Sequence, residues 1–338
     1  MTRRKKHNAQ KYENLIYKQC EKLITCKKDS KMNTYDTKLN TKSDNSFKSG
    51  FIAIVGPPNV GKSTLLNYML GQKLSITSEK PQTTRNRILG VLNRPSAQLI
   101  FLDTPGIHRA NKPLNVKIVD AALSTIGDAD AVLIMADCSH ADPNAESIML
   151  ENLKKNKRPV LLALNKVDLI EKPVILEIIK KWSIMYDFRD IVPISAKRGI
   201  QVEELLKSIE KNLPAGDPLF PDNMLTDMPE RFFVAEIVRE KVFRLTGQEI
   251  PYSVAVTLGS FKEGGKNGLV RIHADIQVEK NSQKGIIIGN KGTKLKSIGE
   301  QARKDIERML GTKVFLKLFV RVQKNWTKDT KILRRFGY

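Results

Sequence analysis

The sequence GPPNVGKS occupies residues 56–63 and follows a short apolar run, FIAIV, at residues 51–55. It fits the pattern GxxxxGK[ST], whose glycines allow the backbone to wrap around a phosphate with several N–H groups pointing inward. Lys62 can then reach the β- and γ-phosphates of a nucleotide, and Ser63 can ligate Mg²⁺. A helix that begins at Lys62 adds the positive end of its dipole. The stretch therefore predicts a strand, a phosphate-binding loop and a helix, in that order.

Further apolar runs follow the first one, and amphipathic stretches separate them. Such an alternation of strands and helices is typical of a doubly wound, mainly parallel α/β sheet. Ligands of these sheets bind at the carboxyl ends of the strands, where the motifs described next are found. The apolar runs occupy residues 99–102, 131–136, 160–164 and 191–194, and the amphipathic stretches occupy residues 114–126, 145–155, 173–182 and 202–213.

The sequence DTPG at residues 103–106 follows the second apolar run. Asp103 is placed to hold Mg²⁺ through water, and the N–H of Gly106 is placed to bond a γ-phosphate. A plain surface turn is the alternative, because Asp, Pro and Gly all favour turns. The position behind a phosphate-binding loop favours the nucleotide role.

The sequence NKVD at residues 165–168 favours guanine over adenine. Guanine presents N1–H and N2–H side by side, so the carboxylate of Asp168 can accept both bonds. Adenine lacks this pair, and a buried carboxylate without partners penalises ATP. Lys166 can lie along the base, and Asn165 can tie this loop to the phosphate-binding loop. The backbone of SAK at residues 195–197 suits the guanine O6, although a short polar loop is the alternative for that motif alone.

The four motifs together resemble those of the translation-factor-like class of small GTPases, over residues 51–213. The resemblance implies a P-loop GTPase domain with GTP, GDP and Mg²⁺ as ligands. It also implies a first switch in the sequence PQTTR at residues 81–85, where Thr84 closes on Mg²⁺ in the presence of the γ-phosphate. Thr83 is the alternative. Thr84 is preferred because related families place the threonine directly before an arginine.

Two residues of this region point to slow catalysis. Ile107 follows the glycine of DTPG and cannot orient water as the glutamine of Ras-like proteins does. His108 comes next, and we interpret it as a surface residue rather than a base. Some GTPases with an apolar residue at this point use K⁺ in place of an arginine finger, and an asparagine of the phosphate loop ligates it. Asn59 matches that position, with a loop-stabilising role as the alternative.

The predicted nucleotide contacts are Gly56, Asn59, Val60, Gly61, Lys62, Ser63, Thr64, Asp103, Gly106, Asn165, Lys166, Asp168, Ser195, Ala196 and Lys197. The predicted Mg²⁺ ligands are Ser63, Thr84 and Asp103, and the predicted K⁺ ligand is Asn59. The predicted catalytic contacts are Lys62, Thr84 and Gly106.

Charge is distributed unevenly along the chain. Residues 1–48 carry a net +8, residues 49–230 carry +1, and residues 231–338 carry +13 of the total +22. RNA or an anionic lipid surface would be attracted mainly to the C-terminal part. Residues 1–48 contain few apolar side chains, and we interpret them as a basic, mostly disordered extension with a short helix around residues 12–23.

A second domain follows the first one. Four prolines within residues 214–230 mark a linker between a domain at 49–213 and a domain at 231–338. In the second domain, patterning predicts helices at 233–245 and 293–310, strands at 253–260, 268–279 and 314–322, and a turn at 264–268. We expect the nucleotide state to reach the second domain through the linker, and the coupling to be reciprocal.

The sequence GNKG at residues 289–292 leads into the second of these helices. A GxxG loop between two helices is typical of a KH fold, here of the α+β type II, because the missing side chains let an RNA backbone approach closely. A lone GxxG is usually a turn, but the order of elements and the basic charge favour RNA. The predicted RNA contacts are Gly289, Asn290, Lys291 and Gly292 of the loop, Lys284, Lys294 and Lys296 around it, and an apolar groove of Ile287 and Ile288.

With both domains placed, residues 49–338 resemble the bacterial Era family, including QARKDIER at 301–308 and the ending LRRFGY. The resemblance implies a GTPase that binds 16S ribosomal RNA near its 3′ end and assists 30S subunit biogenesis. It implies a cytoplasmic protein with peripheral attachment to the inner membrane, and no DNA partner is expected. Residues 1–48 lie outside the family pattern. They are either an extra RNA-binding tail or a misassigned start, since Met32 could open a shorter chain.

Other functions remain open at this point. An RNA chaperone could hydrolyse GTP incidentally, and a membrane-surface GTPase could place its basic ends on anionic lipid. Tandem nucleotide domains are disfavoured because one phosphate loop is present. The three cysteines Cys20, Cys26 and Cys138 form no CxxC pair, which fits a reducing cytosol and disfavours a disulfide framework or a zinc site. No apolar run is long enough to span a membrane.

Overall fold

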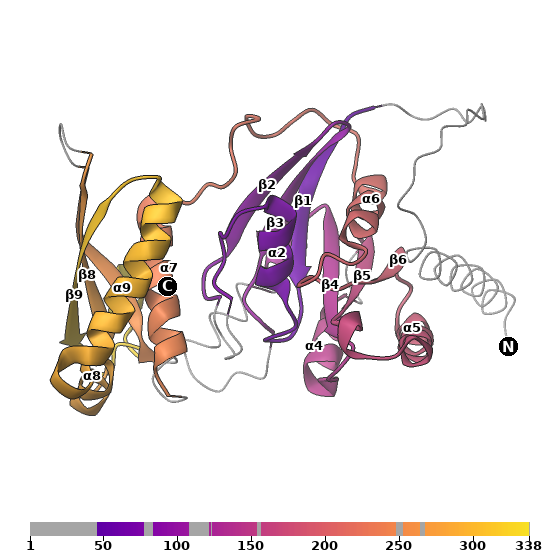
Figure 1. Cartoon of the computed structure of the whole chain (residues 1–338). Helices are drawn as coiled ribbons and strands as arrows, with labels where there is room; N and C mark the ends of the chain where they lie inside the picture. Colours follow the sequence, from indigo (N-terminus) through magenta and orange to yellow (C-terminus); the bar gives the residue numbers. More distant parts are fainter. Residues whose placement is uncertain are drawn as a thin grey trace, which may run out of the picture.

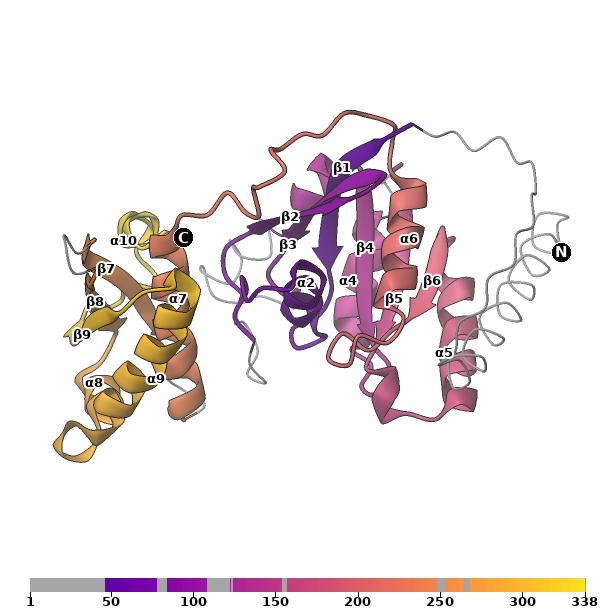
Figure 2. The ribbon, with the colours of Figure 1, turned by 45° about the horizontal axis from the view of Figure 1, so that its top comes forward.

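The computed structural model describes residues 46–77, 84–107, 122, 124–153, 157–247, 253–263 and 268–337. These residues form an α/β domain and a smaller α+β domain, joined by an extended segment (Figure 1; Figure 2). Among them, no helix combines the length and the apolar character needed to cross a membrane. The helix expected around residues 12–23 lies outside the described residues.

The first domain is built on a six-stranded sheet in the order β2-β3-β1-β4-β5-β6. Neighbouring strands are parallel except for β2 and β3, which are antiparallel. The strands are β1 Lys48–Val55, β2 Ile88–Arg94, β3 Ala97–Asp103, β4 Ala131–Asp137, β5 Val160–Asn165 and β6 Asp190–Pro193. The sequence analysis missed β2, an edge strand whose turn into β3 contains no glycine.

Helices cover both faces of this sheet, which is why its central strands are continuous apolar runs. On one face pack α2 and α6, through side chains such as Leu65 and Leu205. On the other face pack α4 and α5, through side chains such as Met149 and Ile179. These helices are α2 Lys62–Leu70, α4 Pro143–Leu153, α5 Lys172–Met185 and α6 Val202–Asn212. The amphipathic stretch at 114–126 lies mostly outside the described residues, although residues 122 and 124–128 are helical.

The segment between the domains is bound to the edge of the sheet and is not a free tether. The side chain of Gln98 accepts hydrogen bonds from the N–H groups of Leu219 and Phe220 at 2.7 and 2.9 Å. The same side chain donates to the carbonyl of Phe220 at 2.8 Å. Further along, the N–H of Val91 donates to the carbonyl of Leu225 at 2.8 Å. These hydrogen bonds therefore hold the irregular chain of the linker against strands β2 and β3.

The second domain has a three-stranded sheet in the order β7-β8-β9, with β7 and β8 antiparallel and β8 and β9 parallel. Helices α7, α8 and α9 pack against it through one apolar core. The elements are α7 Glu230–Leu245, β7 Ala255–Lys262, β8 Val270–Val278, α8 Asn281–Ile288, α9 Thr293–Leu310, β9 Val314–Val322 and α10 Thr330–Arg335. Apart from α10, this is the order expected for a type II KH domain. Residues 264–267 of the expected turn lie outside the described residues.

The two domains contact each other directly. Nζ of Lys73 lies 2.6 Å from a carboxylate oxygen of Glu240 in α7, and Glu240 is 1% exposed. Arg244, one turn later, pairs with the other oxygen of Glu240 at 2.6 Å and donates to the carbonyl of Thr77 at 3.1 Å. A buried carboxylate is costly without partners, so these cations stabilise the contact between the domains.

Candidate nucleotide and RNA sites

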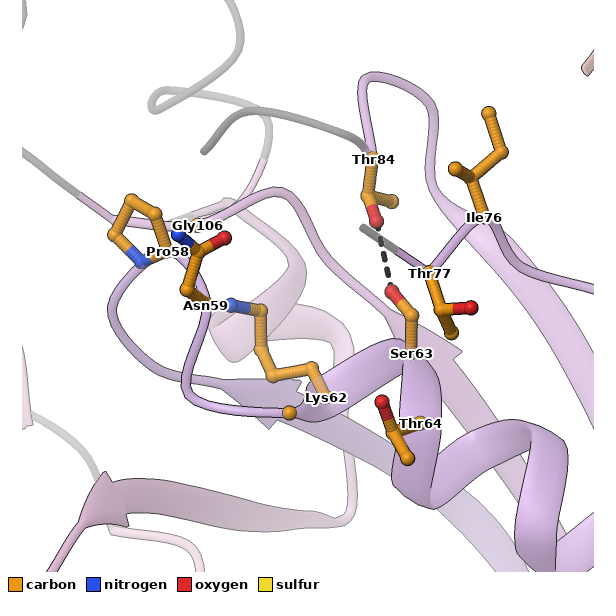
Figure 3. A pocket seen from close by; sticks show the side chains of 10 residues that line it. Pro58, Asn59, Lys62, Ser63, Thr64, Ile76, Thr77, Thr84 and Gly106 are labelled. Atoms are coloured by element: carbon orange, nitrogen blue, oxygen red, sulfur yellow. Dashed lines mark hydrogen bonds between the residues drawn. The ribbon is translucent and has the colours of Figure 1, made fainter. Parts of the chain in front are cut away.

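The phosphate-binding loop joins the end of β1 to the start of α2. A Cβ on Gly56 would lie 2.7 Å from the carbonyl oxygen of Met135, and Gly61 has a φ of +104°. Both positions therefore require glycine, the first for close packing and the second for its backbone conformation. Figure 3 shows the pocket that the loop encloses. Its lining residues are Pro58, Asn59, Gly61, Lys62, Ser63, Thr64, Ile76, Thr77, Thr84 and Gly106.

Lys62 is held inside the loop. Its Nζ donates to the carbonyls of Gly56 at 3.0 Å and Pro57 at 2.7 Å. Burial lowers the pKa of Lys62 to about 8, and the charge of Asp103 opposes part of this shift. An anion bound in the loop would stabilise the charged form of Lys62 and so offset the cost of its burial. The loop therefore suits a ligand that brings negative charge to this nitrogen.

Three oxygen-bearing side chains converge beside Lys62. The hydroxyl oxygens of Ser63 and Thr84 lie 2.9 Å apart, and Ser63 also donates to Oδ2 of Asp103 at 2.9 Å (Figure 3 shows the first of these contacts). Ser75, which the sequence analysis did not single out, donates to the same oxygen at 2.8 Å. These contacts bring together the three residues predicted to hold Mg²⁺.

Asp103 is fully buried, and burial raises the pKa of its carboxyl group, while Lys62 and the hydrogen bonds from Ser75 and Ser63 lower it. Its Oδ1 has no hydrogen-bond partner among the residues that the structure describes. A buried carboxylate oxygen without a partner, next to two hydroxyls, is an oxygen donor set of the kind that Mg²⁺ prefers. The residues therefore fit a magnesium ion held by Ser63 and Thr84, with Asp103 behind it.

The DTPG loop passes close to the phosphate-binding loop. A Cβ on Gly106 would lie 2.7 Å from the backbone nitrogen of Pro58, so no larger residue fits without movement. The N–H of Ile107 donates to the carbonyl of Gly56 at 3.0 Å, and the Ile107 side chain is fully buried in the core. The position where Ras-like proteins place a glutamine is therefore a packing residue here. His108 lies outside the described residues.

Asn165 connects three parts of the nucleotide site. Its Nδ2 donates to the carbonyl of Val60 at 2.7 Å, and its Oδ1 accepts the N–H of Ala196 at 2.9 Å. The expected tie between the NKVD loop and the phosphate-binding loop is therefore present. The bond to Ala196 was not expected, and it holds the SAK backbone beside the predicted base position.

Two further residues that were predicted to contact guanine, Asp168 and Lys166, are paired with neighbouring side chains. Asp168 lies with one carboxylate oxygen 3.2 Å from Nε of Arg198, whose side chain is largely exposed. Lys166 has a φ of +67°, and its Nζ is hydrogen-bonded to Asp137. Because Arg198 is on the surface, its side chain can move away when a base presents its two N–H groups to Asp168. Ser195 is buried and Lys197 is exposed.

The GNKG loop separates α8 from α9. Gly289 has a φ of +72° and Gly292 a φ of +78°, and a Cβ on Gly289 would lie 2.7 Å from Cβ of Lys294. The two residues between them, Asn290 and Lys291, are exposed. Both ends of the loop therefore depend on glycine, and its middle faces solvent, as close contact with an RNA backbone requires.

Comparisons with known proteins agree with both the nucleotide-binding domain and the KH domain. A family model described as 50S ribosome-binding GTPase matches residues 51–166, and a KH-domain model matches residues 249–327. The GTPase Era of Geotalea uraniireducens (strain Rf4) is 55% identical over 296 residues, which cover 88% of this chain and 99% of that protein. The chain belongs to the Era GTPase family.

Solved structures of Era proteins share the arrangement of both domains. Era from Aquifex aeolicus, as a variant bound to GDP.AlF4-, is 43% identical with a TM-score of 0.84, over 86% of this chain and 99% of that one. Era in complex with MgGDPNP and nucleotides 1506–1542 of 16S ribosomal RNA is 45% identical with a TM-score of 0.82, over the same shares of the two chains. The GTPase Era of Geobacter metallireducens is 54% identical over 88% of this chain and 99% of that protein.

One predicted RNA contact of this Era-family chain is wrong. Ile287 is 0% exposed and lies in the core of the KH domain, so its side chain cannot line an accessible groove. The turn of α8 directs Ile287 toward α9 and the sheet, and directs Ile286, which is 45% exposed, to the surface. Ile288 is half-buried. Three consecutive isoleucines hide the helical period, so the sequence alone does not show which of them is buried.

The basic side chains around the GNKG loop differ in exposure. Lys291 and Lys296 are exposed, whereas Lys284 and Lys294 are half-buried. All four belong to α8, the loop or α9. They therefore form a basic rim around the loop, and their RNA-binding role stays a prediction.

Proposed function

We propose that this Era-family chain binds GTP with Mg²⁺, hydrolyses it slowly, and binds 16S ribosomal RNA near its 3′ end through the KH domain during 30S subunit biogenesis. The observation that carries the proposal is the buried Asp103 carboxylate, whose Oδ1 lacks a partner in the described residues beside the hydroxyls of Ser63 and Thr84. The Era complex that contains MgGDPNP and 16S nucleotides supports the same pair of ligands.

In this proposal each nucleotide contact has one task. The loop N–H groups and Lys62 hold the β- and γ-phosphates, and Ser63 and Thr84 hold Mg²⁺, which neutralises charge on the phosphate oxygens. Thr84 and the N–H of Gly106 sense the γ-phosphate. Asp168 selects guanine, and Asn165 holds its loop in place. Since the buried Ile107 cannot orient water, hydrolysis without a partner or K⁺ is slow.

RNA binding rests on the GNKG loop and the charge around it. The loop lets a backbone phosphate approach the N–H groups, and the basic rim neutralises neighbouring phosphates. A single-stranded target fits this mode, because bases must leave the stack to enter a KH groove. We propose the half-buried Ile288 and the exposed Ile286 as the apolar side of that groove.

A pair of matched variants tests the RNA site. Asn290→Asp with Lys291→Asp changes the exposed middle of the loop and keeps both glycines. Lys324→Asp with Asn325→Asp makes the same chemical change at two other exposed neighbours in the same domain. For an RNA that copies the 16S 3′ end, we expect the loop variant to raise Kd by about tenfold or more and to lower the salt slope by about one for each phosphate that the loop no longer neutralises. Equal weakening by both variants would refute a specific loop site.

The cytoplasmic location and the peripheral attachment to the inner membrane are part of the proposal, supported by family membership and basic charge. A flotation assay with vesicles of anionic or of neutral lipid tests the attachment. We expect binding to anionic vesicles that the 16S RNA fragment competes away, because both ligands use the basic charge. Absence of binding to anionic vesicles at physiological salt would contradict direct attachment.

A further inference from the structure

We infer that Arg85 links the nucleotide site to the RNA-binding loop by direct contact between the domains. The inference deepens the proposed function and rests on it. It departs from the expectation that the linker carries the coupling, since the linker is hydrogen-bonded to the edge of the first domain's sheet at Gln98 and Val91.

Arg85 directly follows Thr84, so a displacement of the Thr84 backbone acts directly on Arg85. Thr84 contacts Ser63 at the magnesium position, whereas the Arg85 side chain leaves the first domain. Its Nη1 donates to the carbonyl of Val254 at the start of β7 at 2.8 Å. Its guanidinium carbon lies 6.0 Å from the ring centroid of Trp326, which is fully buried in the KH domain. One step of the backbone therefore separates the magnesium position from the second domain.

The contact point on the KH side connects onward to the RNA-binding loop. Ser253 precedes Val254, and its carbonyl accepts the indole N–H of Trp326 at 3.1 Å. Its hydroxyl accepts the side-chain N–H of Gln283 at 2.7 Å. The Gln283 side chain in turn accepts the N–H of Lys280 at 3.0 Å, at the first turn of α8. Helix α8 then runs without interruption into Gly289.

Burial distinguishes Arg85 from the other cations between the domains. Arg85 is 6% exposed, whereas the side chain of Lys73 is 42% exposed. A buried guanidinium that loses its acceptor leaves unpaired polar groups on both sides, so its docking is close to all-or-none. Lys73 shares the buried carboxylate of Glu240 with Arg244, so that carboxylate keeps a cation when one of the two is removed. A movement of Thr84 is therefore transmitted to the KH domain mainly through Arg85, which acts as a positioning residue.

The measurement is the ratio of RNA affinities with a GTP analogue and with GDP, for the full chain and the 16S 3′-end RNA. Coupling between sites is typically about 5- to 150-fold, and we expect the wild-type ratio in that range. We expect Arg85→Ala to bring this ratio of RNA affinities close to one. Unchanged GDP affinity and an unchanged melting temperature show that the first domain of the variant is intact. Arg85→Lys, which keeps the charge but not the fork, restores only part of the ratio. Arg87→Ala is the matched control, because Arg87 is an exposed arginine two residues later, and it keeps the wild-type ratio.

Each outcome decides between the alternatives. A wild-type ratio that Arg85→Ala leaves unchanged, or that Arg87→Ala abolishes to the same extent, would overturn the role of Arg85. Trp326→Phe, which keeps a smaller aromatic ring and removes the donor to the carbonyl of Ser253, is the second test if Arg85→Ala does not fold, and it lowers the ratio. A wild-type ratio of one would instead refute the expected coupling between nucleotide state and RNA binding, on which the role of Arg85 depends. Because the coupling is reciprocal, the factor by which RNA changes the affinity for the GTP analogue must fall in Arg85→Ala to the same extent as the ratio of RNA affinities.

Discussion

The side chain of Asn165 donates to the backbone carbonyl of Val60 at 2.7 Å across 105 residues of sequence. The same side chain accepts the N–H of Ala196 at 2.9 Å, so one amide group joins the phosphate-binding loop to both loops that surround the predicted base. All three partners are buried. Phosphate and base recognition are therefore held in one geometry by a side chain that is not itself needed to touch the nucleotide.

Replacing Asn165 should lower the affinity for GDP and for a GTP analogue equally. In Asn165→Ala, the buried Val60 carbonyl and Ala196 N–H are left without a partner, which costs about 1–3 kcal/mol, or about 5- to 150-fold in affinity. We expect this loss for GDP and for a GTP analogue alike, measured by fluorescence titration. Asn212→Ala is the control, because that amide donates to the carbonyl of Ser208 within its own helix. A loss of affinity confined to the GTP analogue would contradict this role of Asn165.

Base selectivity should follow the chemistry of residue 168. Xanthine carries a carbonyl where guanine carries N2–H₂, so an amide at this position can accept from N1–H and donate to that carbonyl. We expect Asp168→Asn to lower affinity for GTP and raise affinity for XTP, each by about tenfold or more, without gain for ATP. Asp227→Asn, an exposed change in the linker, should alter none of the three. Unchanged preference for GTP over XTP would rule out contact between Asp168 and the base.

Potassium should accelerate hydrolysis through Asn59. This residue has a φ of +61°, which glycine also adopts freely, so Asn59→Gly removes the amide and keeps the backbone. Replacing Na⁺ by K⁺ at constant ionic strength should raise the wild-type rate by about tenfold, as one charge at the transition state supplies at least about 1.4 kcal/mol. The variant should hydrolyse at the Na⁺ rate in both salts. A wild-type rate that is flat in K⁺ would leave Asn59 with a loop-stabilising role.

The thiol of Cys138 should resist alkylation in the folded protein. Burial, followed by the charge of Asp137, raises its pKa to about 12. An ordinary thiol has a pKa of about 8.5, so at pH 8 the thiolate fraction is lower by about three orders of magnitude. Folding holds the proton on sulfur, and its contribution to stability is lost as pH rises through the unfolded pKa toward the folded one. Iodoacetamide at pH 8, read by peptide mass spectrometry, should spare Cys138 until urea unfolds the chain. Modification under native conditions would contradict the packing at the end of β4.

Local sequence patterns predicted the parts of this molecule that depend on neighbouring residues. The glycines at 56, 61 and 106, the order of the strands and helices apart from β2 and α10, and the bounds of α9 and β9 all follow from spacing and periodicity. Asn165 was identified from its motif, which indicated its tie to the phosphate-binding loop but not its bond to Ala196. A KH domain could be expected from GNKG once the surrounding elements were read in order.

Other features depend on contacts between distant segments, which a single sequence does not encode visibly. Ser75 bonds to Asp103, but an isolated serine in a loop carries no signal. Arg85 reaches the other domain, and only the fold of both domains brings Val254 within its range. Ile287 is buried because α8 packs against α9, a fact that three consecutive isoleucines conceal.

We expect the nucleotide bound in the first domain to set the affinity of the second domain for RNA. The direct measurement is the Kd of the 16S 3′-end RNA with a GTP analogue, with GDP and without nucleotide, at one fixed salt concentration. We predict tighter binding with the GTP analogue than in the other two states, and loss of this advantage in the Asn290→Asp, Lys291→Asp variant. Equal Kd values in all three states would contradict the account, because the two domains would then bind their ligands independently.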